Sequence, residues 1–220
     1  MRKELSIKTV ISTFIVFIAI WSIRTALLKT FIDDNFTLWT KEIINGLIKS
    51  IIWAGFAYYF IKKYDDQLSI KYNQMLRSPI MFKVLLPLIG VVALYHILSK
   101  IIVFGGLYFN HGFHPSQLIG TVFLAGILEE FLFRGWFYNG ISSVLSENKA
   151  IIISSILFVL IHYPKYIVAS TTIPVMLLSS IGIFVAGVIF GWSFKKSKSL
   201  WVPIILHMIW NIVSITIGVV

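Results

Sequence analysis

Two carboxylates and a guanidinium lie within one apolar run, in the stretch Gly126-Ile127-Leu128-Glu129-Glu130-Phe131-Leu132-Phe133-Arg134-Gly135. The run extends from about Gln117 to Tyr138, which is long enough for a helix that crosses about 30 Å of hydrocarbon. A charged side chain at mid-membrane costs roughly 2.5–3.5 kcal/mol on insertion scales. The stretch therefore predicts a transmembrane helix whose ionisable side chains have a structural or chemical role inside the protein.

The rest of the chain has the same apolar character. Of its 220 residues, 58% are hydrophobic and 13% are charged, whereas a soluble domain carries about 25% charged residues. We therefore predict an all-α fold, a polytopic transmembrane helical bundle of about seven spans that forms a single integral membrane domain. A further short or re-entrant segment near residues 99–108 is an alternative. The other predicted spans are Ile7–Ile23, Ile43–Ile61, Met81–Leu98, Lys149–Ile167, Ile173–Phe194 and Leu200–Val219.

Charge and cysteine content narrow the partners and the chemistry. The net charge is +10, but no basic stripe with interleaved exposed aromatics is present, so we expect the lipid bilayer and not nucleic acid as a partner. Lys and Arg gather on the predicted inner segments, which favours a cytoplasmic N-terminus and a C-terminus outside. The absence of cysteine excludes thiolate catalysis and Cys-ligated zinc. The many Ile, Lys and Asn residues favour a bacterial plasma membrane as the location.

Helical spacing separates the two carboxylates. Glu130 and Arg134 are four residues apart, so they share a helix face, with Glu on the N-terminal side, which is the better orientation for an ion pair. Glu129 is rotated by about 100° from Glu130 and has no basic partner on its own helix. We therefore expect Glu130 and Arg134 to support the site and Glu129 to be the reactive carboxylate. The alternative is that both carboxylates serve packing only. Lys49, a single basic residue in the second predicted span, receives no role.

Two further predicted spans carry polar residues that can meet Glu129. Glu129 lies 17 residues before Ser146 and His162 lies 16 after it, so an antiparallel hairpin that turns near Ser146 puts both at similar depth. His207 and Asn211 are four residues apart and share one helix face. Such side chains point into the bundle or a wet cavity, although a polar clasp between helices is the alternative. We expect the four residues to converge on one cavity that opens toward the cytoplasmic side.

This set of residues suits hydrolysis. Glu129 can deprotonate a water that His162 holds, and His207 and Asn211 can donate hydrogen bonds to the oxyanion of a tetrahedral intermediate. In a second arrangement, Glu129, His162 and His207 hold a zinc ion with an open water position. No cofactor is favoured, and the spacing alone leaves both arrangements open.

Three motifs follow one another in the second half of the chain: Glu129-Glu130-x-x-x-Arg134, then Phe158-x-x-x-His162 with Ser154-Ser155 ahead of it, and then His207-x-x-x-Asn211. Together they resemble the motifs of the CPBP family, intramembrane proteases related to the CAAX prenyl endopeptidase, with bacterial members linked to bacteriocin processing and self-immunity. The resemblance covers about residues 115–215, the expected protease core, and leaves residues 1–110 without a motif. It implies Glu129 as catalytic base, His162 as its water-binding partner, and His207 and Asn211 as the oxyanion site.

The resemblance implies an intramembrane endopeptidase of the CAAX type, but it does not identify a substrate. Because most bacteria do not prenylate proteins, a bacterial member would cut a peptide precursor, a signalling peptide or the tail of a membrane protein. The family's chemistry is described both as metal-dependent and as metal-free. Asn211 is better suited as a hydrogen-bond donor than as a metal ligand, and this favours the metal-free form. A non-enzymatic bacteriocin self-immunity or membrane scaffold protein is the alternative function. A proton-coupled transporter is disfavoured because neither internal repeats nor Gly/Pro-broken helix pairs are evident.

Overall fold

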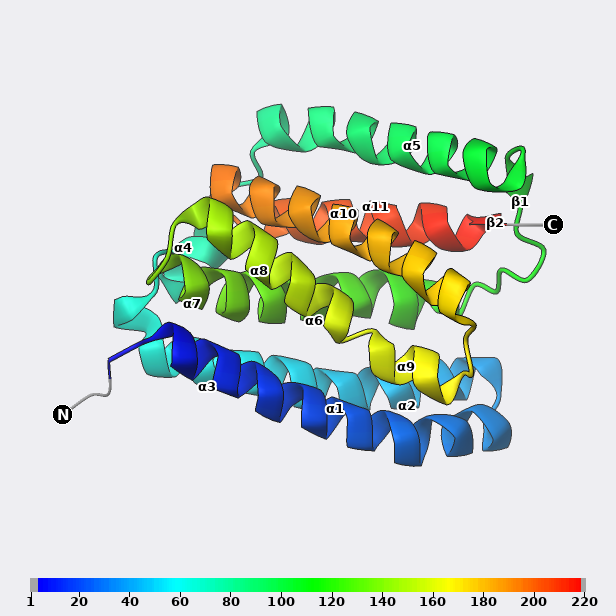
Figure 1. Cartoon of the computed structure of the whole chain (residues 1–220), viewed down its shortest axis with the longest axis horizontal. Helices are drawn as coiled ribbons and strands as arrows, with labels where there is room; N and C mark the ends of the chain where they lie inside the picture. Colours follow the sequence, from blue (N-terminus) through cyan, green and yellow to red (C-terminus); the bar gives the residue numbers. More distant parts are fainter. Residues whose placement is uncertain (1–3, 219–220) are drawn as a thin grey trace.

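Long helices make up most of the structure, a computed structural model that describes residues 4–218 (Figure 1). Helix α1 spans Ile7–Asn35 and is capped by Ser6, whose hydroxyl accepts a hydrogen bond from the Thr9 N–H. Helix α2 (Leu38–Lys49), a π-helical segment (Ser50–Ala54) and helix α3 (Gly55–Tyr64) follow without a break and form one rod. A 3₁₀ turn (Asp65–Gln67) and the short helix α4 (Tyr72–Arg77) then lead to helix α5 (Phe82–Phe104).

The second half of the chain begins with a rod that passes through the middle of the bundle, here called the central rod. It consists of a π-helical segment (Leu118–Leu124), helix α6 (Ala125–Glu130), a second π-helical segment (Phe131–Tyr138) and helix α7 (Asn139–Ser142). Helices α8 (Glu147–Leu160), α9 (Tyr163–Val168), α10 (Ile173–Ser197) and α11 (Trp201–Thr216) follow. Strand β1 (Tyr108–Phe109) pairs antiparallel with strand β2 (Ile217–Gly218) beyond the end of α11.

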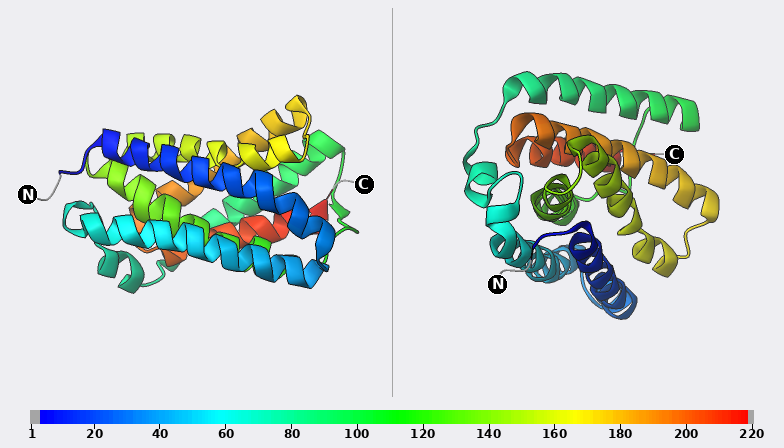
Figure 2. Two further views of the ribbon diagram at one scale, coloured as in Figure 1. Left: turned by 90° about the horizontal axis from the view of Figure 1, so that it is seen from below. Right: turned by 60° about the vertical axis from the view of Figure 1, so that its left-hand side comes forward.

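The central rod is surrounded by the other helices, as the right-hand view of Figure 2 shows. Leu132, Phe133, Trp136 and Phe137 are fully buried, so the second half of the rod contacts protein on all faces, whereas Phe123 in the first half is 53% exposed. Charged side chains on this rod can therefore be satisfied by neighbouring helices rather than exposed to lipid, which is the condition for ionisable residues inside a membrane.

The outer surface of the bundle is apolar, as a lipid-facing surface must be. Leu27 on α1, Ile102 on α5 and Ile173 on α10 are 70%, 79% and 67% exposed. Within the described residues, five helical stretches are long and apolar enough to cross a membrane: Ile7–Asn35, Leu38–Gln67, Phe82–Val103, Glu147–Val168 and Ile173–Ser197. The predicted all-α membrane bundle is thus confirmed, while the count of about seven spans stays a prediction.

Several helix boundaries differ from those predicted. The first helix continues past Ile23 to Asn35, although Arg24 and Lys29 were expected in an outer loop. Both cations have partners within the helical structure. Arg24 donates a hydrogen bond to the Asn45 side chain on α2, and Lys29 pairs with Asp33 one turn further along α1. The region near 99–108 forms no separate helix in the described structure. Helix α5 instead continues to Phe104 and ends at Gly105, whose φ of 75° is in the left-handed region.

The predicted fifth span is also not one continuous helix. Helix α8 ends at Leu160 and helix α9 starts at Tyr163, with Pro164 in its first turn. Proline lacks the N–H that a continuing helix needs and clashes with the preceding turn. His162 therefore lies at a break between two helices. The last predicted span reached Val219, which lies outside the described residues, and helix α11 ends at Thr216.

The connections predicted to face the cytoplasm lie together at one end of the bundle. The Ser69 N–H donates to the Ser143 hydroxyl, Lys198 pairs with Glu147 at 2.6 Å, and the Ser199 hydroxyl donates to the Ser78 carbonyl. The β1–β2 pair lies at the opposite end (Figure 1). The segments near Ser69, Ser146 and Ser197 therefore share one side of the molecule.

Candidate active site

A pocket of about 300 Å³ lies between the central rod, helices α1, α2, α9 and α11, and the break between α8 and α9. Glu129, His162, His207 and Asn211 all line it. The structure therefore brings together the four residues that the three motifs singled out, although they come from α6, the break between α8 and α9, and α11. Their assignment as catalytic residues stays a prediction.

Glu129 lies at the inner end of this pocket and is 7% exposed. Its Oε1 accepts a hydrogen bond from the Lys49 ammonium of α2 at 2.5 Å. Its Oε2 lies 3.9 Å from Nε2 of His207 and has no hydrogen-bond partner among the described residues. One carboxylate oxygen is thus held by a cation, and the other is free to accept a proton.

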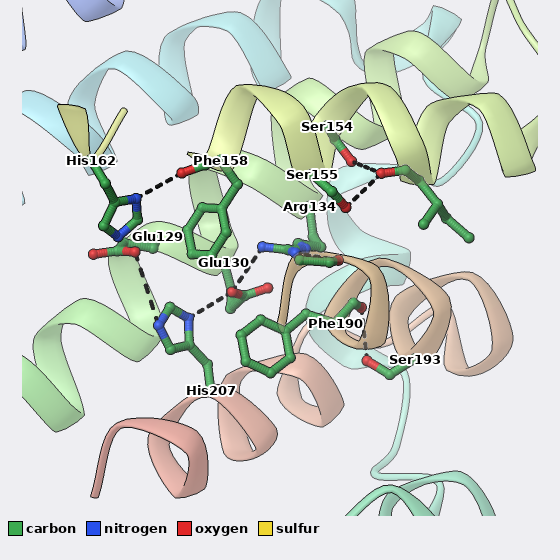
Figure 3. A network of polar contacts seen from close by, with 12 residues as sticks. Glu129, Glu130, Arg134, Ser154, Ser155, Phe158, His162, Phe190, Ser193 and His207 are labelled. Atoms are coloured by element: carbon green, nitrogen blue, oxygen red, sulfur yellow. Dashed lines mark hydrogen bonds and ion pairs between the residues drawn. The ribbon is translucent and has the colours of Figure 1, made fainter. Parts of the chain in front are cut away.

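Glu130 lies on a neighbouring face of α6 and is fully buried. Its Oε1 accepts a hydrogen bond from Arg134 Nη1 at 3.0 Å, the pair that the i, i+4 spacing predicted. The same oxygen lies 2.7 Å from His207 Nδ1 (Figure 3). Since a carboxylate accepts, the imidazole donates through Nδ1–H, and this leaves Nε2 directed toward Glu129. Glu130 therefore orients His207 as well as Arg134, which the spacing alone did not indicate.

Arg134 is buried between two aromatic rings from different helices. Its guanidinium carbon lies 5.1 Å from the ring centre of Phe158 on α8 and 5.3 Å from that of Phe190 on α10. Its Nη2 donates to the Gly187 carbonyl of α10 at 2.8 Å. The Phe190 ring also stacks on His207 at 4.9 Å between ring centres. Arg134 thus connects the central rod to α8 and α10 and encloses the His207 side of the site.

Main-chain carbonyls orient the two remaining side chains. His162 Nδ1 lies 2.7 Å from the Phe158 carbonyl, so Nδ1 carries the proton and Nε2 keeps its lone pair for the pocket. Asn211 Nδ2 donates to the Thr121 carbonyl at 2.7 Å, which leaves its second N–H available. In Figure 3 the imidazole of His162 lies beside Glu129, opposite His207.

The local backbone of the central rod brings these groups together. Helix α6, which carries Glu129 and Glu130, lies between two π-helical segments, a geometry that is frequent at functional sites. Glycines allow the neighbouring helices to come close. A Cβ at Gly187 would lie 2.9 Å from Ser155 of α8, and one at Gly126 would lie 2.8 Å from Met208 of α11.

The sequence interpretation missed the contribution of the first two helices. Lys49 was visible as a lone charge in an apolar span, which is itself a signal of function, but nothing in the sequence indicated Glu129 as its partner. Helices α1 and α2 also supply much of the outer pocket wall, with Trp21, Arg24, Lys29, Asp33, Glu42 and Asn45.

The pocket lies toward the end of the bundle opposite to the N-terminal end of α1, and its predicted cytoplasmic opening stays a prediction. Its outer wall includes Lys29 and Asp33 near the C-terminal end of α1 and Lys165 on α9. With the N-terminus inside, this end of the bundle faces outward, so a cytoplasmic opening and a cytoplasmic N-terminus exclude each other. The two expectations conflicted because the distribution of Lys and Arg predicts the membrane side of each loop, and it does not predict at which end of the bundle the pocket lies.

The donor set fits a metal ion poorly. The Lys49 ammonium already binds Glu129 Oε1, and a divalent cation at the same carboxylate would meet its positive charge at close range. His207 and His162 engage Nδ1 with Glu130 and the Phe158 carbonyl and keep Nε2 for the pocket, as metal-bound imidazoles also do, so the Lys49 ammonium and not the histidines opposes a metal ion. Over residues 4–218, no group of three or more His, Asp or Glu side chains is arranged to hold a metal.

Fold and site together define a class of protein: a polytopic helical membrane protein with a buried polar centre that faces one internal pocket. Residues 110–213 match the family model described as type II CAAX prenyl endopeptidase Rce1-like. The resemblance predicted from the motifs is therefore confirmed for residues 110–213. Neither a curated protein nor a solved structure matched the chain.

Proposed function

We propose that the protein is an intramembrane endopeptidase in which Glu129 activates a water molecule against a peptide bond of a membrane-associated peptide or protein tail. The observation that supports this most is the free Oε2 of a buried carboxylate, directed toward two imidazoles in one pocket. The lone pair of His162 Nε2 and Glu129 Oε2 together present two acceptors to one water. The family match supports peptide hydrolysis as the reaction.

The reaction proceeds in two proton transfers. Glu129 takes a proton from the water, and the resulting hydroxide adds to the carbonyl carbon of the scissile bond. The negative charge on the former carbonyl oxygen is stabilised by the free N–H of Asn211 and, when it carries a proton, by Nε2 of His207. Glu129 then gives its proton to the leaving nitrogen, and the C–N bond breaks. The pocket residues perform each step without a metal ion.

The test is cleavage of a peptide library by the purified full-length protein in lipid nanodiscs, read by mass spectrometry. Glu129→Gln removes the base but keeps the size of the side chain, and we expect a rate loss of about 10²–10⁴-fold or more, the typical contribution of a general base. Glu147→Gln is the matched control, because this carboxylate pairs with Lys198 at the far end of the bundle. Full cleavage by Glu129→Gln would remove the assignment.

Two further measurements separate the alternatives. Activity that is lost to a chelator and restored by zinc would transfer water activation to a metal ion. A cellular immunity phenotype that survives both Glu129→Gln and His162→Ala would favour the non-enzymatic self-immunity or scaffold function instead.

A further inference from the structure

Arg24 is a buried cation in the wall of the pocket with no carboxylate partner among the described residues. It is 9% exposed and lies on α1. Its Nη2 donates to the neutral side-chain carbonyl of Asn45, and its Nε has no hydrogen-bond partner in the described structure. Its guanidinium carbon lies 5.1 Å from the centre of the Trp21 ring. Asp33 acts on this guanidinium electrostatically but forms no ion pair with it in the described structure, so Arg24 lines the pocket with one N–H donor unused.

Most other charges that line the pocket are already paired. Lys29 binds Asp33, and Lys49 binds Glu129. Lys165 and Glu42 also line the pocket, and Glu42 packs against Gly120 of the central rod. Counting four cations (Arg24, Lys29, Lys49, Lys165) against three anions (Asp33, Glu42, Glu129), the wall carries a net +1.

The position of Arg24 relative to Glu129 follows from α2. Asn45, which binds Arg24, and Lys49, which binds Glu129, are four residues apart on that helix, so they lie on one face about 6 Å apart along the axis. A negative group held by Arg24 would therefore be about one helical turn from the carboxylate that we propose as the base.

We propose that Arg24 forms an anion-binding subsite that holds a carboxylate of the peptide substrate beside the bond to be cleaved. The identity of the ligand rests on the proposed function. A guanidinium binds carboxylates through two parallel N–H donors, and burial strengthens such charge-assisted hydrogen bonds. The ligand would also offset the cost of an unpaired charge inside a membrane helix. A peptide offers this group either at its C-terminus or on an Asp or Glu side chain.

The experiment measures binding with three forms of one fluorophore-labelled apolar decapeptide that contains a single Glu: the free acid, the C-terminal amide, and the free acid with Glu replaced by Gln. Binding is followed by fluorescence anisotropy to full-length Glu129→Gln protein in phosphatidylcholine nanodiscs, so that no cleavage occurs. We expect one neutralised form to bind about tenfold more weakly than the free acid, equivalent to about 1.4 kcal/mol. The amide identifies the C-terminal carboxylate as the ligand, and the Gln form identifies the side chain.

Variants of Arg24, each added to the Glu129→Gln background, connect that preference to this side chain. Arg24→Gln should remove the preference, and Arg24→Lys should keep part of it, which separates the loss of charge from misfolding. Arg77→Gln, on exposed α4 away from the pocket, should leave the preference unchanged. Equal binding of all three peptides, or a preference that persists in Arg24→Gln, would overturn the proposal.

The outcomes also distinguish this subsite from the proposed reaction. Charge-selective binding that depends on Arg24, without cleavage by the wild-type protein, keeps the subsite and refutes the protease. Cleavage by the wild-type protein that is indifferent to peptide charge and to Arg24 keeps the protease and refutes the subsite.

Discussion

Lys49 gives Glu129 a fixed orientation that the motif alone does not provide. Its ammonium binds Oε1 at 2.5 Å and lies 4.5 Å from the ring centre of Trp53. Because Lys49 holds Oε1, Oε2 is the oxygen that faces Nε2 of His207. A buried carboxylate without this partner would be an uncompensated charge, which is costly in a protein interior.

We therefore predict that Lys49→Met lowers kcat for peptide cleavage at least tenfold, which is about 1.4 kcal/mol, and leaves KM within about threefold of the wild-type value. The reason is that the base loses its orientation while the walls of the pocket remain. Lys49→Arg should restore part of kcat, because it keeps the charge. The measurement is steady-state kinetics together with the melting temperature of each variant. Lys195→Met, which removes a peripheral partner of Glu147, is the control. Unchanged kcat in Lys49→Met would exclude the positioning role.

At the residue scale, the sequence predicted the local pair and missed the distant one. Glu130 and Arg134 are one turn apart on the same rod, so helical spacing alone determines their contact. Lys49 and Glu129 are 80 positions apart, and their contact depends on how α2 packs against the central rod. No spacing rule in a single sequence encodes that packing.

The elements around the site depend on close helix contacts. Helices α8 and α10 approach each other where Gly187 meets Ser155, and the Gly187 carbonyl accepts the hydrogen bond from Arg134. A methyl group at Gly187 would lie 3.1 Å from the Ser155 Cα, which is backbone and cannot rotate away. The helices would have to separate, and the anchor of Arg134 would move with them.

Gly187→Ala should accordingly destabilise the protein by about 1–3 kcal/mol, the usual cost of overpacking, and reduce peptide cleavage. A lower melting temperature in detergent is the expected observation. Gly90→Ala on α5, where an added Cβ meets nothing within 4 Å, should leave both properties unchanged. Equal melting temperatures for the two variants would show that the α8–α10 contact is looser than described.

At the level of elements, the positions of the helices were predictable and their irregularities were not. Apolar runs identified where the helices lie, because lipid-facing surfaces require them. The π-helical segments on both sides of α6 leave no mark in the hydropathy pattern. The break at His162 had one visible signal, Pro164, which cannot continue a helix.

The whole molecule provides a test of topology. The segments near Ser69, Ser146 and Ser197 lie at one end of the bundle, so reporter fusions at these three positions should agree, and the charge bias predicts a cytoplasmic signal. A fusion in the α1–α2 connection at Phe36 should report the other side. Opposite signals at Ser146 and Ser197 would contradict the bundle. A cytoplasmic signal at all three would mean that substrates reach the pocket from outside.

The family match and the pocket cover different parts of the molecule. The matched segment, residues 110–213, contains the three motifs. Trp21, Arg24, Asn45 and Lys49, which line the same pocket, precede it. Motif residues determine the chemistry that we propose, and the first two helices form the wall that a substrate would meet.

Three of the side-chain anchors in the site are peptide carbonyls: those of Thr121, Phe158 and Gly187 bind Asn211, His162 and Arg134. Every amino acid supplies a carbonyl, so these anchors impose no side-chain identity at their own positions. Natural variation can therefore be neutral at position 121, while it is restricted at 187 by volume and at 158 by the aromatic ring. Sequence comparison across homologues would find the donors of this site and overlook the acceptor at position 121.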